Sequence, residues 1–420
     1  MRILVVTQYF WPEVFRINEV VQSLRDVGND VTVLTGQPNY PDGVIHPGYS
    51  MLSVRVQEHQ GLQIHRVPLF PRGKGSGVRL ALNYLSFVVF ASGLGPWLLR
   101  GKKFDVVFVH GMSPILQAIP GICLAWIKRA KLVTWVQDLW PESLSVTGFV
   151  RNKTVLDAVG HMVRWIYRSN DLLLVQSRAF VAPVGAMAGA TPVEYHPNPG
   201  EMAFSETAMA AQPALRLLPG FNVVFAGNLG IVQSLGTILE AAELLSDLPD
   251  VHFVLVGSGS RDEWLADEVS RRGLANVLLA GRFPPDAMPG ILSQASALLV
   301  TLVRDPVMAQ TIPSKVQAYL AAGKPILAVL DGEGADVVRE SAAGIACSAE
   351  DAVGLAGAVR ELRRMSDSQR ERLGVAGRSY YQRHFEPRVL ANVLAARLER
   401  LVADRSGPGG PAHGHAEGAR

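Results

Sequence analysis

Short runs of Val, Ile and Leu recur along this chain at helix-length intervals, and this alternation restricts its fold more than any other feature. The runs stand at 3–7, 31–36, 62–67, 105–110, 131–137 and 171–177, and again at 221–227, 251–260, 276–281, 297–302 and 325–330. Apolar residues occupy both parities of each run, as in strands that are buried on both faces. The sequence therefore predicts an α/β protein with two Rossmann-like domains, each built on a parallel sheet covered by helices.

The stretch between the two series lacks this pattern. Residues 190–220 contain prolines at 192, 197, 199, 213 and 219, which indicates an interdomain connection. We expect a first domain over 1–197 and a second over 198–385. From Ser406 onward the chain has no large apolar residue, and 404–420 is predicted to be a disordered tail.

Charge and cysteine content narrow the class of protein. The formal net charge is +3, which is too small to indicate a nucleic-acid partner by itself. The two cysteines, Cys123 and Cys347, match no metal or redox spacing, so we interpret both as reduced core residues of a cytosolic protein. The apolar run at the N-terminus is too short for a secretory signal and is expected to be a buried strand.

The region 66–103 has an unusual charge pattern. It contains no Asp or Glu but seven basic residues, which are Arg66, Arg72, Lys74, Arg79, Arg100, Lys102 and Lys103. Between Arg79 and Arg100 the chain reads LALNYLSFVVFASGLGPWLL, an apolar stretch flanked by cations that is typical of a membrane-surface element. Two alternatives stay open. The stretch is long enough to span a bilayer, although its polar, Gly and Pro residues weaken that reading, and a buried core helix has the same composition.

A candidate anion site lies in QTIPSKVQAYLAAGKP, residues 310–325. Pro313 and Ser314 mark a helix start, and Gly323 marks its end. Lys315 then stands in the first turn, beside unpaired backbone N–H groups and the positive end of the helix dipole, where a phosphate binds well. The alternative is a solvated surface lysine in an ordinary helix.

Two glycine-bearing turns follow strands of the second series. They are AGNLG at 226–230 and VGSGS at 256–260, in which Gly227, Asn228, Gly257 and Gly259 allow the backbone to approach a phosphate or ribose. The chain has no GxGxxG or GxxxxGK[ST] motif and no DxD pair, so neither a dinucleotide cofactor nor a metal is expected. Cations must then balance a diphosphate, with Lys315 first and Arg282 of AGRFP as an auxiliary.

Together these stretches carry a resemblance. The opening ILVVTQYFWPE, the loop PNYPDG, the phrase VQDLWPESL, the turn AGNLG and the block IPSKVQAYLAAGKPIL resemble family 4 glycosyltransferases of the GT-B fold. Within that family the chain looks most similar to the N-acetyl-L-fucosamine transferases of O-antigen, capsule and colanic acid assembly. The resemblance covers nearly all of 1–403. It implies two Rossmann-like domains facing across a cleft, with a C-terminal helix at about 386–403 crossing back to the first.

The resemblance also implies roles in the second domain. Lys315, with Ser314, would contact the diphosphate of a nucleotide-sugar, and the two glycine turns would line its cleft. The family's two glutamates, however, are matched by Gln310 and Ala318, and its usual lysine in the first donor loop by Gln233. Glu333 of DGEGAD is our candidate replacement for those carboxylates.

Candidate acceptor residues follow strands of the first domain. Asp138 would hydrogen-bond the transferred sugar or the acceptor hydroxyl, or else cap a helix start. Arg16 would meet an acceptor diphosphate, or else be a surface arginine. The remaining candidates are His110, for which a core histidine is the alternative, and Asn39 and Tyr40, for which an ordinary turn is the alternative.

These features lead to one expected function and two rivals. We expect a metal-independent, retaining glycosyltransferase that moves an N-acetyl-hexosamine or deoxy sugar from a nucleotide donor, for which we predict UDP, to a polyprenyl-diphosphate-linked saccharide. It would be cytoplasmic and peripherally bound to the inner membrane surface through 66–103. The rivals are a nucleotide-sugar 2-epimerase and a non-catalytic nucleotide-sugar-binding protein. Product formation without an acceptor would favour the first rival, and binding without turnover the second.

Overall fold

A computed structural model describes residues 1–73, 77–142, 144, 152–200 and 214–404 of the chain. Contacts divide it into two compact units: unit 1 comprises Met1–Leu174, Gly185–Glu194 and Ala391–Arg420, and unit 2 comprises Val175–Val184 and Tyr195–Leu390. Lys74, Ser143, most of the expected connection (201–213) and the tail from 405 lie outside the described residues.

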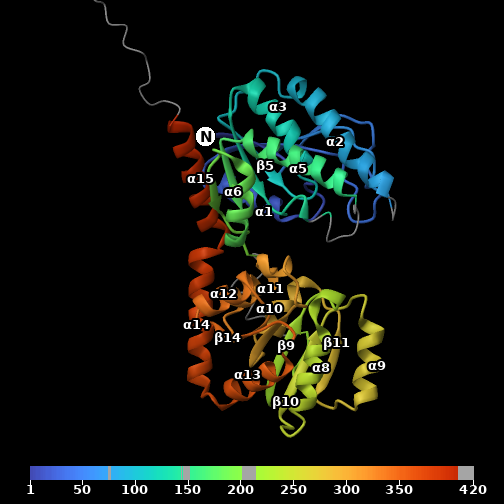
Figure 1. The fold of residues 1–420 in the computed structure, drawn as a ribbon, viewed down its shortest axis with the longest axis vertical. Coiled ribbons are helices and arrows are strands. Elements are labelled where there is room, and N and C mark those ends of the chain that lie inside the picture. Colours follow the sequence, from blue (N-terminus) through green and yellow to red (C-terminus); the bar gives the residue numbers. More distant parts are fainter. Residues whose placement is uncertain (74–76, 143, 145–151, 201–213, 405–420) are drawn as a thin grey trace, which may run out of the picture. The chain divides into compact units, whose positions relative to one another are not determined.

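Unit 1 is built on an eight-stranded sheet in the order β3-β4-β2-β1-β5-β6-β7-β8 (Figure 1). The strands are β1 (Arg2–Val6), β2 (Asp30–Thr35), β3 (Arg55–His59), β4 (Leu62–Arg66), β5 (Val106–Gly111), β6 (Lys131–Val136), β7 (Leu172–Val175) and β8 (Val193–Tyr195). β3 is antiparallel to β4, whereas β4, β2, β1, β5 and β6 pair in parallel. Strand order reverses beside β1, and ligands of such sheets bind at this switch point.

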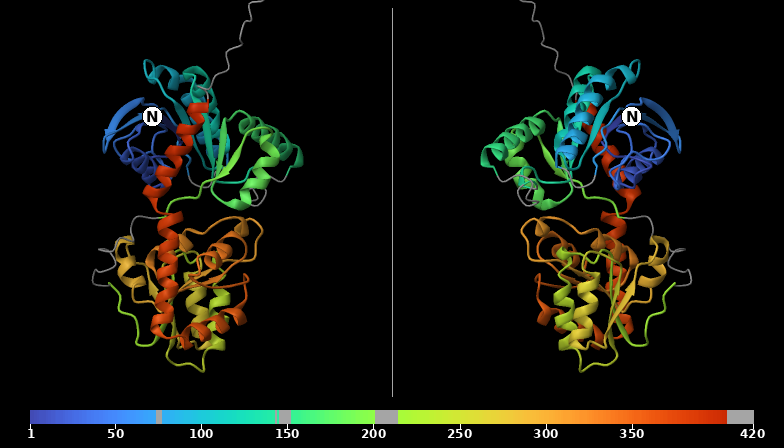
Figure 2. Two further views of the ribbon diagram at one scale, coloured as in Figure 1. Left: turned by 90° about the vertical axis from the view of Figure 1, so that its left-hand side faces the viewer. Right: turned by 90° about the vertical axis from the view of Figure 1, so that its right-hand side faces the viewer.

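Helices cover both faces of this sheet. They are α1 (Arg16–Asp26), α2 (Gly77–Leu98), α3 (Ala118–Lys128), α5 (Lys153–Arg168), α6 (Val181–Ala188) and α15 (Pro387–Ala403). α1 and α15 pack on one face, where Leu394 and Leu398 join a core cluster with Ile3 and Val5 of β1 (Figures 1 and 2). The last helix of the chain therefore completes the core of the first strands.

Helix α2 lies on the opposite face, with α3 beside it. A Cβ on Gly95 of α2 would lie 3.2 Å from Leu34 of β2 and 3.5 Å from Leu124 of α3. α2 is long and apolar enough to cross a membrane, judged by length and composition alone. Of its most apolar window, 22% is buried within the protein. The helix is thus neither fully exposed nor fully core.

Unit 2 repeats the same architecture. Its sheet has the order β11-β10-β9-β12-β13-β14, with every pairing parallel. The strands are β9 (Phe221–Ala226), β10 (Val251–Val256), β11 (Val277–Gly281), β12 (Ala297–Thr301), β13 (Ile326–Val329) and β14 (Gly344–Cys347). The switch point lies between β9 and β12, so the loops after these two strands are expected to form the binding site.

Two buried clusters sandwich this second sheet. The strand residues alternate between them: Phe221, Val223 and Phe225 of β9 face one cluster, and Val224 and Ala226 the other. The helices of the first cluster are α8 (Leu235–Leu244), α9 (Asp262–Arg272) and α13 (Ala352–Arg364). Those of the second are α10 (Met288–Leu292), α11 (Ser314–Ala322), α12 (Glu333–Glu340) and α14 (Asp367–His384).

The predicted strands are all present, within one to four residues at their ends. Sequence reasoning missed β3, β8 and β14. β3 has only exposed and half-buried residues along RVQEH, and β8 and β14 have only three and four residues, so none carries a strong buried-strand pattern. One detail is corrected: Ser314 does not cap its helix, because the N-cap is Pro313, which makes no side-chain cap.

Candidate functional site

A cavity of about 880 Å³ opens in unit 2 at the carboxyl ends of its strands. Seven of the eight predicted donor-side residues line it: Gly227, Asn228, Gly257, Gly259, Arg282, Ser314 and Lys315. They come from the turns after β9, β10 and β11 and from the first turn of α11. The fold thus brings together residues that are far apart in the sequence.

Lys315 is the best placed cation in this cavity. Its Nζ lies 3.8 Å from the centroid of the Phe225 ring and donates a hydrogen bond to Oε1 of Gln233. Burial lowers the pKa of Lys315 to about 7. Its partners are thus a neutral amide and an aromatic face, and no Asp or Glu is among the described residues that line the cavity. A desolvated ammonium without a carboxylate partner favours binding of an anion.

The glycine turns are packed too closely for side chains. Gly227 has φ of +132°, and a Cβ there would lie 2.7 Å from Cε of Lys315. Gly257 has φ of +145°, and its Cβ would lie 1.8 Å from the carbonyl oxygen of Gly227. Backbone hydrogen bonds join the turns, from Gly227 N–H to the Val256 carbonyl at 2.8 Å and from Gly257 N–H to the Gly281 carbonyl at 2.8 Å. Glycine at both positions keeps the lysine against the backbone.

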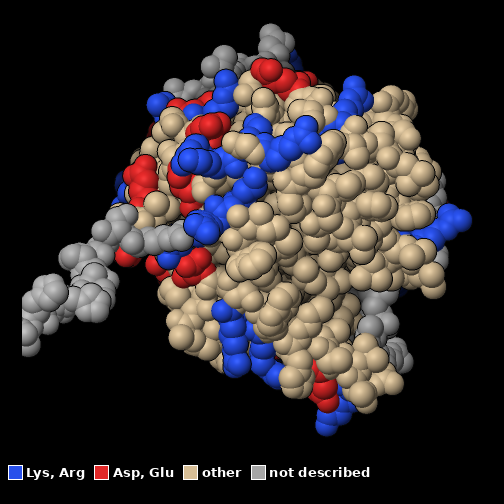
Figure 3. Space-filling view, turned by 90° about the horizontal axis from the view of Figure 1, so that it is seen from above, with Lys and Arg blue, Asp and Glu red and all other residues tan. Residues whose placement is uncertain are grey.

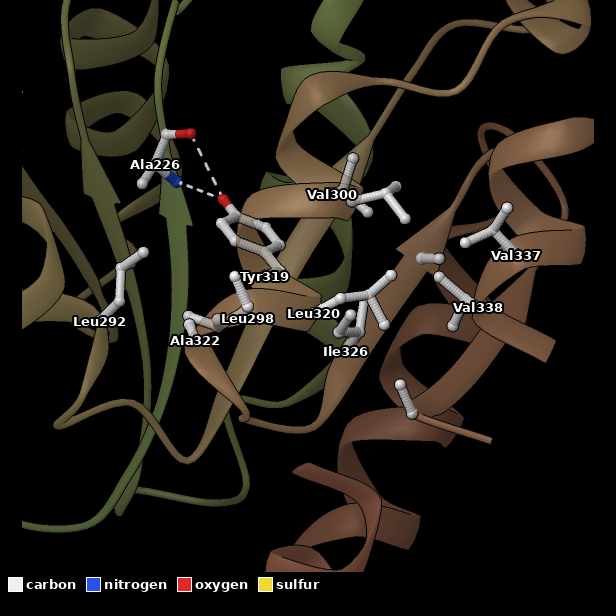
Figure 4. Close-up of a cluster of buried hydrophobic side chains, with 14 of the residues drawn as sticks. Ala226, Leu292, Leu298, Val300, Tyr319, Leu320, Ala322, Ile326, Val337 and Val338 are labelled. Atoms are coloured by element: carbon white, nitrogen blue, oxygen red, sulfur yellow. Dashed lines mark hydrogen bonds between the residues drawn. The ribbon is translucent and has the colours of Figure 1, made fainter. Parts of the chain in front are cut away.

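Tyr319 connects α11 to the end of β9, a contact that sequence reasoning missed. Its hydroxyl accepts a hydrogen bond from the Ala226 N–H at 2.9 Å and lies 3.3 Å from the Ala226 carbonyl oxygen (Figure 4). The ring is buried among Leu298, Leu320 and their neighbours. This bond fixes the helix that carries Lys315 directly beside the turn that begins at Gly227. The tyrosine is visible in the sequence, but nothing there identifies its partner.

The substituted positions differ in their placement. Gln233 and Ala318 line the cavity, in the positions that match the family's lysine and one of its glutamates. Gln310 does not line it, and its side chain donates to the Pro306 carbonyl at 3.1 Å. The eighth predicted donor residue, Glu333, is not brought to the cavity either. Glu333 is the first residue of α12. Its carboxylate accepts a hydrogen bond from the Ala179 N–H and lies near Arg178.

In unit 1, His110 lies within β5, and Asp138 follows the neighbouring strand β6. His110 is 3% exposed, and burial, with a smaller effect of Arg16, lowers its pKa to about 3. The imidazole is therefore neutral, in keeping with a core histidine. Asp138 is half-buried, and its Oδ2 accepts from the Ser113 N–H at 2.9 Å. The carboxylate thus holds the loop after β5; the helix start that it was expected to cap lies partly outside the described residues.

The remaining acceptor candidates divide into one buried and two accessible side chains. Asn39 is completely buried, and its Oδ1 accepts from the Arg72 N–H at 3.0 Å. It therefore holds the loop rather than facing a ligand. Tyr40 is 37% exposed, and the Arg72 guanidinium lies 5.2 Å from its ring centroid. Arg16 is half-buried at the first position of α1.

Glu13 organises these loops, although sequence reasoning did not single it out. The side chain is 2% exposed, and its carboxylate accepts from the N–H groups of Asn39 at 2.7 Å, Tyr40 at 2.7 Å and Phe10 at 3.3 Å. Burial raises its pKa, and those hydrogen bonds oppose the shift. The opening loop and the PNYPDG loop are thereby joined through one buried carboxylate. A glutamate within FWPEVF gives no local sign of this, because its partners are 26 and 27 residues away.

We expect Glu13→Gln to lower the unfolding free energy by about 1–3 kcal/mol, because one amide oxygen cannot accept all three N–H groups and the new NH₂ faces a donor. Thermal and urea unfolding measure this. Glu58→Gln, which changes an exposed side chain on β3, is the control and should change stability by less than about 1 kcal/mol. Equal effects of the two substitutions would contradict the role given to Glu13.

Two family models match the chain, one on each α/β sheet. Residues 14–199 match the glycosyl transferase 4-like domain, and residues 220–364 match the domain of glycosyl transferases group 1. Together they span both sets of loops described above. The chain is a glycosyltransferase.

Relatives of this glycosyltransferase agree. The putative colanic acid biosynthesis glycosyl transferase WcaI of Escherichia coli K12 is 29% identical over 338 residues, covering 77% of this chain and 82% of the relative. The probable glycosyltransferase WbjE of Pseudomonas aeruginosa is 26% identical over 326 residues, covering 73% and 77%. Assignment to the N-acetyl-L-fucosamine transferase subgroup is not decided by these matches.

Solved structures give the transferase the GT-B fold that its sequence predicts. Sucrose-phosphate synthase from Thermosynechococcus elongatus superposes with a TM-score of 0.68 at 16% identity, covering 96% of this chain and 99% of that one. HepE of Anabaena, solved in complex with UDP, superposes with a TM-score of 0.66 at 15% identity, covering 95% and 100%. The rival readings, an epimerase and a non-catalytic binding protein, are not favoured by any of these matches.

Proposed function

We propose that this glycosyltransferase moves a sugar from a UDP-sugar to a polyprenyl-diphosphate-linked saccharide in surface-polysaccharide assembly. The sugar is an N-acetyl-hexosamine or a deoxy derivative, and transfer proceeds with retention of configuration and without a catalytic metal. The similarity to the E. coli colanic acid transferase supports the biosynthetic role. The UDP complex of HepE supports the choice of nucleotide.

The observation that carries the proposal is the environment of Lys315. The ammonium stands at the N-terminal turn of α11, within a cavity bounded by two glycine turns and lacking carboxylates among its described lining residues. A nucleotide diphosphate supplies the anion that this arrangement favours. Arg282, exposed at the rim, adds a second cation within the same cavity.

The proposed chemistry follows from the charges that develop during transfer. The bond between the anomeric carbon and the β-phosphate oxygen breaks, and its electron pair stays on the departing UDP. The acceptor hydroxyl oxygen bonds to the anomeric carbon, and its proton passes to the departing diphosphate or to Asp138. Lys315 and the N–H groups of the α11 first turn stabilise the negative charge on UDP, which is greater in the transition state than in the bound donor.

On the acceptor side, the proposal assigns Arg16 to the lipid diphosphate and Tyr40 to the acceptor saccharide. Both side chains are accessible in unit 1, whereas Asn39 and His110 are buried, and Asn39 acts through the loop that it holds. A lipid-linked acceptor requires the chain to work at a membrane surface. We therefore propose the cytoplasmic face of the inner membrane as its place of action, reached through the region 66–103.

We expect nucleotide-sugar affinity to fall as the pH rises through about 7, because the neutral Lys315 amine must take up a proton to pair with the diphosphate. The decrease should continue above that pKa until the affinity reaches that of Lys315→Ala, since the diphosphate of a nucleotide-sugar does not titrate there. Calorimetry with a UDP-sugar between pH 6 and about 9 measures it, and Lys315→Ala should show no such slope. A slope shared by wild type and variant would assign the proton to another group.

The proposed function is tested by release of nucleotide diphosphate from a panel of UDP- and GDP-sugars, with and without polyprenyl-diphosphate-GlcNAc in detergent. We expect release from a UDP-sugar only when the acceptor is present. Release without acceptor, together with an epimerised sugar, would overturn the transferase mechanism. Acceptor-dependent release from a GDP-sugar alone would overturn the UDP assignment, and a chelator that abolishes release would overturn metal independence.

A further inference from the structure

Helix α2 presents one apolar face that is exposed among the described residues of unit 1. Its buried face consists of Asn83, Ser86, Phe87, Ala91 and Gly95. The exposed large side chains Val78, Leu82, Leu85 and Val89 recur at intervals of four, three and four residues, which places them on a single stripe. Val78 and Val89, at the two ends of this stripe, are 72% and 64% exposed.

The stripe continues into exposed aromatic residues where α2 and α3 end. Trp97 near the end of α2 is 57% exposed, and Trp126 near the end of α3 is 82% exposed. The two helix ends are in contact, because Lys128 Nζ of α3 donates to the Leu99 carbonyl oxygen at 2.5 Å. Two large indoles in water at one end of a folded unit indicate an interaction surface.

The charges around this surface are mostly positive. From Trp97 to Lys131 the chain has six Lys or Arg residues and one acidic residue, Asp105, which pairs with Arg2 at 2.6 Å. Exposed arginines stand at each limit of the apolar area: Arg79 near the start of α2, Arg100 just after its end and Arg129 just after α3. The Arg100 guanidinium lies 4.9 Å from the centroid of the Trp97 ring.

A cavity of about 1030 Å³ adjoins the same end of α3. Its wall includes Trp126, Ile127, Arg129 and the ion pair between Lys131 and Asp171. Figure 3 views the end of unit 1 that carries α2 and α3, and shows a broad surface without Lys, Arg, Asp or Glu, with Lys and Arg gathered along its border. Apolar surface, indole rings and bordering arginines together match the boundary between headgroups and acyl chains of an anionic bilayer.

We propose that the exposed stripe of α2 and the adjoining ends of α2 and α3 form a single lipid anchor. In this anchor the stripe, Trp97 and Trp126 enter the acyl boundary, and Arg79, Arg100 and Arg129 contact lipid phosphates. α3, which lies outside the basic region identified in the sequence, contributes one of the two indoles. The choice of lipid over a protein partner rests on the proposed lipid-linked acceptor.

The other face of α2 indicates docking rather than spanning. Asn83 is fully buried and donates to the Phe70 carbonyl at 2.6 Å, while its Oδ1 accepts from Gln8 at 2.7 Å. Removing this helix from unit 1 would leave those polar groups without hydrogen-bond partners and would expose the buried Phe87 side chain. The anchor therefore lies in the interfacial plane with the sheet of unit 1 behind it.

Sedimentation with vesicles tests the anchor. Wild type should bind vesicles of phosphatidylcholine containing phosphatidylglycerol, and bind less to phosphatidylcholine alone or at high salt. The double substitution Trp97→Ser and Trp126→Ser should weaken binding at least about tenfold. Val89→Ser should weaken it measurably, whereas Val353→Ser, which removes a valine of similar exposure from α13 of unit 2, should leave it unchanged.

Each alternative outcome has a distinct meaning. Absence of vesicle binding by wild type, or equal binding by wild type and the double variant, overturns the anchor. A dimer that the double variant dissociates assigns the surface to a second copy of the chain instead. Transfer to the detergent-solubilised acceptor is measured in parallel and should be unchanged in the double variant. A wild-type protein that binds vesicles but transfers no sugar to this acceptor would refute the proposed function and leave the anchor standing.

Discussion

Replacing Lys315 by alanine is expected to lower the rate of sugar transfer by about 10²–10³-fold, with a smaller effect on donor affinity. The reason is that the ammonium pairs most strongly with charge that develops on the leaving diphosphate. Single-turnover kinetics at saturating UDP-sugar separate this from weaker binding. We expect Lys315→Arg to be a poor rescue, because a longer side chain with a planar guanidinium would replace an ammonium that packs against Gly227 and the Phe225 ring.

The matched control is Lys324→Ala. Lys324 is the other lysine of unit 2. It precedes β13 and therefore lies at the amino ends of the strands, whereas the Lys315 cavity lies at their carboxyl ends. This variant should transfer sugar within about threefold of the wild-type rate. A comparable loss in both variants would mean that removing any lysine from unit 2 impairs the enzyme. A Lys315→Ala variant with wild-type turnover would remove the proposed leaving-group role.

Gly257→Ala is expected to have the largest effect on stability, about 2–4 kcal/mol, and to abolish donor binding in the fraction that folds. The added Cβ would stand 1.8 Å from a backbone oxygen, which no rotamer change relieves, and the φ of +145° strains any residue with a side chain. To relieve this clash, the turn must move away from the Gly227 turn and open the cavity. Urea unfolding and calorimetry with UDP measure the two consequences.

Gly236→Ala in α8 is the control for this substitution. A Cβ at Gly236 meets no atom within 4 Å, and its backbone lies within a helix. Alanine there should leave UDP binding unchanged and raise stability by up to about 1 kcal/mol. If Gly257→Ala were as stable as Gly236→Ala and bound UDP normally, the close contact between the two turns would not exist in solution.

Much of the fold was accessible from the sequence because its determinants are local. Buried strands in a parallel sheet have apolar residues on both parities, and the helix of 314–322 has a proline before its start and a left-handed glycine, φ +66°, at its end. The structure places the glycine turns and Lys315 around one cavity, since parallel strands place the loops after their carboxyl ends along one edge. Short or half-exposed strands such as β3 and β14 lack this periodic pattern and were missed.

The sequence by itself thus determined the two α/β units and the grouping of Lys315 with the two glycine turns in unit 2. Only the tertiary structure decided which polar groups are buried and with whom they pair. Lys315 donates to a glutamine 82 residues away, and Glu13 holds a loop 26 residues away. Asn39 is buried, and Glu333 lies away from the cavity. Helix α2 exposes one apolar stripe and buries its opposite face. The physical reason is that periodicity and turn chemistry act between neighbours in sequence, whereas desolvation and hydrogen-bond partners depend on contacts between distant segments.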